Sequence, residues 1–308
     1  MKSLINYSEL TDFETLNNLI GEGKANEVVA VCEQYQEDEI DLIYNEIKNR
    51  NIPIVMVTGP TSSGKTTFAS RLSNKFEVPP LVLSIDDFFY GNDEVDKTNV
   101  PADYFESIAA VNVDLFNQCV YSLMGKKKTA IPYYDFKLGR SIKENRFAVL
   151  QDGQEIIVEG IHAFNETLLP EIKPWNKYGI FIHFGTDVEA AGELISKRDM
   201  RLVRRTIRDK LFRGCDVERT QQLWKGVISF EQDNILPFES RASRVFNSYL
   251  PYEPAITGRL LRKFLDEVGE SEDLVHIRNI AKKLECFRFV DRALVPPNSI
   301  LKEFIGDF

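Results

Sequence analysis

The feature that most limits how this chain can fold is a loop of small residues that directly follows an apolar run in the sequence. IVMVT (residues 54–58) has the apolar and β-branched composition of a buried strand. GPTSSGKT (59–66) follows it, and the helix-forming stretch TTFASRLSNKF continues from there. The loop fits G-x-x-x-x-G-K-[ST] at every fixed position. The sequence therefore predicts a strand, a tight loop and a helix in direct succession.

The residue types of this loop suit a bound phosphate. Gly64 lets the backbone approach an anion, and successive N–H groups form a concavity that holds it. The next helix adds its positive N-terminal end. Lys65 reaches the β- and γ-phosphates, and the Thr66 hydroxyl is offered to Mg²⁺. We predict binding of ATP with Mg²⁺ by these nucleotide-binding residues: Gly59, Thr61, Ser62, Ser63, Gly64, Lys65, Thr66 and Thr67.

A phosphate loop alone does not name a reaction, because GTPases, motor ATPases and small-molecule kinases share it. Guanine recognition uses an N-K-x-D pattern, whereas here Asn176-Lys177 is followed by Tyr178-Gly179. A GTPase is therefore disfavoured.

Short β-rich runs alternate with helical stretches from residue 51 onward. Four such runs are predicted strands, at 54–58, 81–85, 155–159 and 178–184. Apolar strands separated by helices are typical of a parallel sheet covered on both faces. We therefore expect an α/β fold with a central, mostly parallel sheet flanked by helices. Ligands of such sheets lie beyond the carboxyl ends of the strands.

The chain is expected to divide into a small N-terminal helical segment (1–50) and a main domain (51–308). Residues 40, 43 and 47 of the first segment are isoleucines at helical spacing, with Leu42 beside them. Within the main domain, 126–154 is a predicted hairpin insertion. The last third (216–308) is predicted to be helical, with C-terminal helices and a tail over 255–308.

Composition and charge narrow the class of partner. The formal net charge of −9 argues against a general affinity for nucleic acid or anionic membranes. The four cysteines are scattered and predict reduced thiols. No apolar run approaches the roughly 20 residues that span a bilayer, and the acidic N-terminus does not resemble a signal peptide. We expect a cytoplasmic protein that binds neither nucleic acid nor membrane.

Acidic residues follow the second and third predicted strands. Asp86 ends the stretch LVLSID and is placed to accept a proton from an attacking hydroxyl. Asp87 is expected to cap the next turn instead. Glu159 follows IIV and is placed to hold Mg²⁺, directly or through water. His162, close behind, is expected to be structural.

A helix rich in arginine is predicted over 197–214. Its arginines recur at i, i+3, i+4 and i+7, which places them on one face. Such a face is either solvated or a lid that closes over a triphosphate, where guanidinium groups bind phosphate oxygens and stabilise charge. We expect the lid, formed by Arg201, Arg204, Arg205 and Arg208.

Five motifs occur in the order seen in the uridine kinase/phosphoribulokinase family, which this chain resembles over about residues 52–250. They are GPTSSGKTTFASRL, SIDDFFY, YDFKLGR, VEGIHAF and DMRLVRRTIRDKLFRG. The resemblance implies a P-loop NTPase fold, here in a longer bacterial nucleoside kinase-like branch with most of its N-terminal extension missing.

The resemblance also implies transfer of the γ-phosphoryl group of ATP to a hydroxyl, in nucleoside members the 5′-hydroxyl of uridine or cytidine. By position, Asp86 resembles the family base, and Tyr134 resembles the aromatic residue that lines the nucleobase pocket. The implied catalytic residues are Asp86, Lys65, Arg204 and Arg208. Arg201 and Arg205 are implied nucleotide ligands, and Thr66 and Glu159 are implied Mg²⁺ ligands.

Two departures from the family pattern concern the acceptor. Uridine kinases carry a histidine shortly after Y-D-F, and this chain has none between Tyr134 and Arg140. The aspartate of their F-D-H-P-D segment is replaced by Asp103 or by Glu106. A second reading is therefore a kinase of a non-nucleoside alcohol, with Lys137 and Arg140 receiving an anionic acceptor. A third is an ATP-binding regulatory protein. The acceptor and any homo-oligomer are left open.

Overall fold

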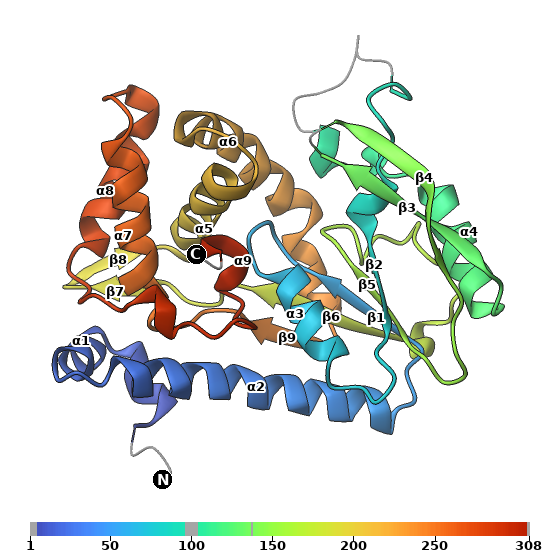
Figure 1. Ribbon diagram of the computed structural model, residues 1–308, viewed down its shortest axis with the longest axis horizontal. Coiled ribbons are helices and arrows are strands. Elements are labelled where there is room, and N and C mark those ends of the chain that lie inside the picture. The colour runs from blue at the N-terminus through green and yellow to red at the C-terminus, as the bar shows by residue number, and fades with distance from the viewer. Residues whose placement is uncertain (1–4, 96–103, 137, 307–308) are drawn as a thin grey trace.

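A five-stranded parallel sheet organises the chain. The computed structural model describes residues 5–95, 104–136 and 138–306 (Figure 1). The strands lie in the order β2-β5-β1-β6-β9, and each pairs in parallel with its neighbours. Their bounds are β1 Ile54–Thr58, β2 Leu81–Ser84, β5 Ile156–Glu159, β6 Lys177–His183 and β9 Arg244–Asn247. Since β1 is central, the loop behind it lies at the middle of the carboxyl edge.

The four strands expected from the sequence are confirmed to within one residue at each end. The prediction that 216–308 is all helical is wrong, because β9 lies within that range and adds the edge strand beside β6. Its sequence, RVFN, buries only Phe246. A four-residue edge strand with one buried apolar side chain carries too weak a pattern to be recognised before its neighbour is known.

Helices cover both faces of the sheet (Figure 1). The longest, α2, spans Ala25–Asn49, and none of the described helices combines the length and apolarity needed to cross a bilayer. The others are α1 Phe13–Gly21, α3 Lys65–Ser73, α4 Val113–Met124, α5 Lys197–Phe212, α6 Val217–Asn234, α7 Glu253–Asp266, α8 Val275–Leu284 and α9 Lys302–Ile305.

The two faces of β1 belong to two separate apolar cores, because successive side chains of a strand point in opposite directions. Val55 and Val57 pack in the larger core, together with α2, α3, α5, α7 and α8. Ile54 and Met56 pack in the smaller core, with α4. Both cores are buried, so the central strand is fixed on each side and the loop that follows it is held in place.

Two antiparallel hairpins extend from the sheet. Within the range expected to hold a hairpin, β3 (Thr129–Asp135) pairs with β4 (Arg140–Ala148). A smaller hairpin, which the sequence did not indicate, joins β7 (Val188–Ala190) to β8 (Glu193–Ile195) and leads directly into α5.

The N-terminal helices share the larger core rather than forming one of their own. Ile40, Ile43 and Ile47 of α2 are fully buried in it, as their helical spacing predicts. A polar contact adds to this packing: Arg71 of α3 donates to Glu37 at 2.8 Å. Helix α2 runs along one side of the molecule (Figure 1). The stability of the main domain therefore depends in part on residues before 51.

Replacing Ile43 by alanine tests this shared core. We expect the free energy of unfolding to fall by about 2–5 kcal/mol, because a fully buried isoleucine is cut back and leaves a cavity. The matched control is Leu42→Ala in the same helix, where the side chain is 49% exposed and the loss should be far smaller. Urea unfolding of both variants measures the difference, and equal losses would contradict the shared core.

Candidate active site

The loop between β1 and α3 adopts a conformation that only its glycines permit at two positions. Gly59 has φ +144°, and a Cβ there would lie 2.0 Å from the carbonyl oxygen of Ile182. Gly64 has φ +93°, and its Cβ would lie 2.5 Å from Ile300 Cγ2. The loop therefore passes close to β6 and to the C-terminal segment, and it delivers Lys65 as the first residue of α3.

Two side chains of the loop carry unused donors. The hydroxyls of Ser62 and Ser63 are buried, and within the part of the chain that the structure describes they have no hydrogen-bond partner. Buried polar groups are normally satisfied. Phosphate oxygens of a nucleotide would supply the missing acceptors, so the loop fits the anion that its sequence predicts.

Lys65 lies beside the loop that precedes it. Its ammonium donates to the carbonyl oxygens of Gly59 and Pro60, each at 3.0 Å. Burial lowers the pKa of Lys65, and the nearby charges of Glu159 and Glu303 oppose that shift. The lysine is thus held at the mouth of the loop in a setting rich in negative charge.

A cavity of about 290 Å³ lies in front of the loop. Among the described residues, equal numbers of cations and carboxylates line it: Lys65, Arg205, Arg208 and Arg213, with Asp86, Glu106, Glu159 and Glu303. Two larger hollows, of about 580 and 540 Å³, lie around α8 and α7 and do not include the phosphate loop. The chemistry of the residues, rather than size, therefore identifies the small cavity as the candidate site.

The two strand-end carboxylates meet because of strand register. Ser84 pairs with Glu159 across β2 and β5, and Asp86 follows two residues later. Burial raises the pKa of Asp86, with Lys65 acting against that shift. Burial and the neighbouring charge of Asp86 together raise the pKa of Glu159 to about 7. The site thus contains two carboxyl groups whose environments favour proton uptake.

Thr66 and Glu159 are suited to a divalent cation. The Thr66 hydroxyl lies 3.5 Å from a carboxylate oxygen of Glu159, beside Lys65. Hydroxyl and carboxylate oxygens are the hard ligands that Mg²⁺ prefers, and this ion usually takes further oxygens from substrate phosphates and water. The donor set therefore fits Mg²⁺.

Arg205 and Arg208 of α5 face the cavity. Arg205 lies 3.7 Å from Glu106 and donates to the Thr61 hydroxyl at 3.4 Å. Arg208 lies 3.3 Å from Glu303, and burial together with the charge of Arg213 lowers its pKa to about 10. The guanidinium groups of Arg205 and Arg208 line the cavity in front of the loop, as does that of Arg213.

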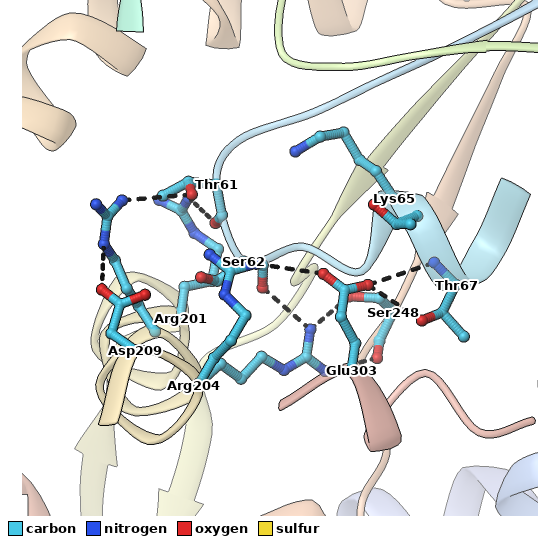
Figure 2. Close-up of polar contacts among 12 residues, drawn as sticks. Thr61, Ser62, Lys65, Thr67, Arg201, Arg204, Asp209, Ser248 and Glu303 are labelled. Carbon is cyan, nitrogen blue, oxygen red and sulfur yellow. Dashed lines mark hydrogen bonds and ion pairs between the residues drawn. The ribbon is translucent and has the colours of Figure 1, made fainter. Parts of the chain in front are cut away.

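Arg201 and Arg204 do not line the cavity; they are buried and donate to carbonyl oxygens of the loop (Figure 2). Arg201 donates to Glu231 at 3.0 and 2.7 Å and to the Thr61 carbonyl oxygen at 3.0 Å. Arg204 is fully buried, donates twice to Glu253 at 2.6 Å, and also reaches Ser248. The geometry gives no support to a contact between Arg204 and a transferring phosphate, since its guanidinium is enclosed by protein. The alternative of a solvated arginine face is also wrong, because Arg201, Arg204 and Arg205 are all buried.

The acceptor-side residues expected from the sequence are not all brought together. Tyr134 is 2% exposed and packs edge-on against Phe89 and Phe136, and these two phenylalanines, not Tyr134, line the cavity. Arg140 is exposed at the start of β4 and does not line the cavity. Asp103 lies outside the described residues, as does Lys137.

Glu106, which the sequence offered beside Asp103 as the counterpart of the family's aspartate, does line the cavity, and burial raises its pKa. His162 is buried, packs edge-on against Phe230 and has a pKa lowered to about 4 by burial, which fits a structural position. The expected cap at Asp87 is not seen among the described residues: its side chain accepts from the Tyr134 N–H at 3.4 Å and from Arg146 at 2.6 Å, and so links the end of the second strand to the hairpin.

Among the described residues, six that line the cavity were not predicted as site residues: Phe89, Phe136, Gly160, Ile161, Arg213 and Glu303. Five of them lie within motifs already singled out: Phe89 in SIDDFFY, Phe136 in YDFKLGR, Gly160 and Ile161 in VEGIHAF, and Arg213 in DMRLVRRTIRDKLFRG. Glu303 lies in the C-terminal tail, more than 200 residues from the loop in sequence, and no local pattern marks it.

The fold and the loop define a P-loop nucleotide-binding protein of the α/β class. The model of the phosphoribulokinase/uridine kinase family matches residues 54–249, which is more than half of the sequence. The chain belongs to this family.

Curated relatives are similar over part of their length. Uridine kinase-like protein 5 of Arabidopsis thaliana is 30% identical over 166 residues, covering 54% of this chain and 32% of that protein. Uridine kinase of Saccharomyces cerevisiae is 25% identical over 288 residues, covering 90% of this chain and 52% of that protein. The chain thus spans about a third to a half of these relatives.

Among solved structures, a possible uridine kinase from Bacillus stearothermophilus superposes with a TM-score of 0.46 at 18% identity. The match covers 68% of this chain and 97% of that chain.

The position of Arg204 leads to a prediction about stability. Arg204→Ala should lower the free energy of unfolding by about 3–5 kcal/mol, because it leaves the fully buried Glu253 without its counterion. Removing both partners should recover part of that loss. Urea unfolding checks this, with Arg219→Ala on the exposed side of α6 as control. A loss no larger than that of the control would contradict the supporting position of Arg204.

Proposed function

We propose that this protein is an ATP-dependent small-molecule kinase that transfers the γ-phosphoryl group to a hydroxyl of a nucleoside such as uridine or cytidine. One observation carries the proposal: the Asp86 carboxyl group lines the same small cavity as Lys65, Thr66 and Glu159. Membership of the family and the names of its relatives support the nucleoside as acceptor.

The phosphate donor is held by the loop and its neighbours. The N–H groups at the start of α3 and the ammonium of Lys65 bind the phosphates, and Arg205 and Arg208 stabilise charge on the transferring group. Thr66 and Glu159 would hold Mg²⁺, which neutralises charge on the phosphates when bound. Arg201 and Arg204 contribute by fixing the loop from behind.

Asp86 prepares the acceptor hydroxyl. In its ionised form the carboxylate accepts the hydroxyl proton, and because burial raises its pKa, it is a stronger base than an exposed aspartate. The cavity is lined by residues that follow β2 and β5, by α5 and by the turn between β3 and β4. This enclosure limits the access of water to the reacting atoms.

The walls of the cavity favour a nucleoside. Phe89 and Phe136 present aromatic rings to it, and a planar base stacks well on such surfaces. Glu106 is placed to accept hydrogen bonds from sugar hydroxyls, with Arg205 3.7 Å away to balance its charge. Arg140, which was to favour an anionic acceptor, does not line the cavity. An ATP-dependent regulatory switch would have no use for a base at Asp86.

The acceptor is tested directly by a substrate panel. Purified protein with ATP and Mg²⁺ should phosphorylate uridine or cytidine, and should turn over sugars, sugar phosphates and hydroxy acids far more slowly. Formation of ADP in a coupled assay, with product identified by mass spectrometry, measures this. Turnover of a non-nucleoside alcohol without turnover of any nucleoside would replace the proposed acceptor, and no turnover at all would favour the regulatory reading.

The base is tested by Asp86→Asn. We expect ATP binding to persist while turnover falls roughly 10²–10⁴-fold, the usual contribution of a general base. Asp87→Asn is the matched neighbour and should lose much less, because that side chain points to the hairpin. Lys65→Ala should lose nucleotide binding as well as turnover. Steady-state kinetics and ATP titration separate the three variants, and unchanged turnover in Asp86→Asn would remove Asp86 from the mechanism.

A homo-oligomer and a cytoplasmic location stay predictions. Light scattering of the purified protein measures the first.

A further inference from the structure

The C-terminal segment packs directly onto the phosphate loop. Ile300, Leu301, Phe304 and Ile305 are each fully buried around α9. The Phe304 ring lies 4.8 Å from the Arg204 guanidinium, and Ile300 occupies the space beside Gly64. This packing anchors the backbone of the segment, because releasing it would expose four large apolar side chains to water.

Glu303 projects from this anchored segment onto the start of α3 (Figure 2). One of its carboxylate oxygens accepts hydrogen bonds from the Thr67 N–H at 3.3 Å and from the Thr67 hydroxyl at 3.1 Å. The other oxygen lies 3.3 Å from Arg208. A negatively charged group thus takes two donors and one cation at the positive end of the helix.

These are the groups that a nucleotide phosphate uses in a loop of this kind. The N–H groups in the first helical turn have no partner within the helix and form the natural anion site. Two anions at hydrogen-bond distance from the same donors repel each other strongly where solvent is limited. A phosphate on Thr67 and the Glu303 carboxylate on Thr67 therefore exclude each other.

We propose that Glu303 is an internal competitor for a phosphate subsite of the nucleotide, and that binding of ATP displaces its carboxylate from Thr67. This inference rests on the proposed nucleotide site. Since the backbone of α9 is anchored, displacement is a rotation of the Glu303 side chain rather than release of the segment. The tail thereby sets the affinity for nucleotide, and anything that loosens or tightens α9 changes that affinity.

The test is the affinity of Glu303 variants for phosphate-bearing ligands. Glu303→Ala removes the competitor, and the dissociation constant of ATP should fall by about tenfold or more, the size expected when a hydrogen bond to a charged group no longer competes. Glu303→Gln, which keeps the shape but loses the charge, should show a smaller gain. Titration calorimetry on the full chain measures both, and Glu270→Gln on the exposed surface is the control.

A second probe separates competition from a change in packing. Inorganic triphosphate should gain affinity in the same ratio as ATP, whereas adenosine, which has no phosphate, should not gain. Unchanged or weaker ATP binding in both Glu303 variants, with thermal unfolding like that of the wild type, would overturn the inference. Loss of folding in Glu303→Ala leaves Glu303→Gln to decide.

The inference and the proposed function fail in distinguishable ways. If the wild type binds ATP and phosphorylates an alcohol while neither Glu303 variant binds more tightly, the inference alone is wrong. If neither the wild type nor any variant binds ATP or triphosphate, both are wrong.

Discussion

The phosphate loop depends on a fully buried ion pair behind it. The Arg204 guanidinium is bound twice by Glu253 at the start of α7 and also reaches Ser248, just beyond β9, and the Ser62 carbonyl oxygen of the loop at 3.4 Å. A buried pair of this kind adds little net stability compared with apolar residues, but its broken form is costly, so it fixes one geometry. Three parts of the chain that are distant in sequence, namely the loop, α5 and residues 248–253, are thereby held together.

Charge balance in the cavity follows from that arrangement. With the loop fixed, α5 presents Arg205 and Arg208 from one side, while Asp86 and Glu159 come from the strand ends on the other. Burial raises the pKa of both carboxyl groups, the charge of Asp86 raises that of Glu159 further, and Lys65 acts against both shifts. Because cations and carboxylates line the cavity together, it can bind a highly charged phosphate and still keep a carboxylate as a base for a hydroxyl. Glu303 brings a further negative charge to the Thr67 N–H and to Arg208.

Residue patterns of local origin were predictable, and those set by packing were not. The loop Gly59–Thr66 and the buried strands have strong periodicity or fixed spacing, and they were placed almost to the residue. The arginine helix was placed too, but spacing on one face could not tell Arg204, which pairs with Glu253, from Arg208, which faces the cavity. The difference arises from what packs against each turn of α5.

By itself the sequence determined the class of fold, the phosphate loop and the two strand-end carboxylates, because each is specified by residues adjacent in the chain. Only the tertiary structure decided that Phe89 and Phe136 rather than Tyr134 face the cavity, and that the tail supplies Glu303. Both depend on contacts between segments far apart in sequence. Such contacts are selected by complementary shape and charge once the cores are formed, so no local pattern encodes them.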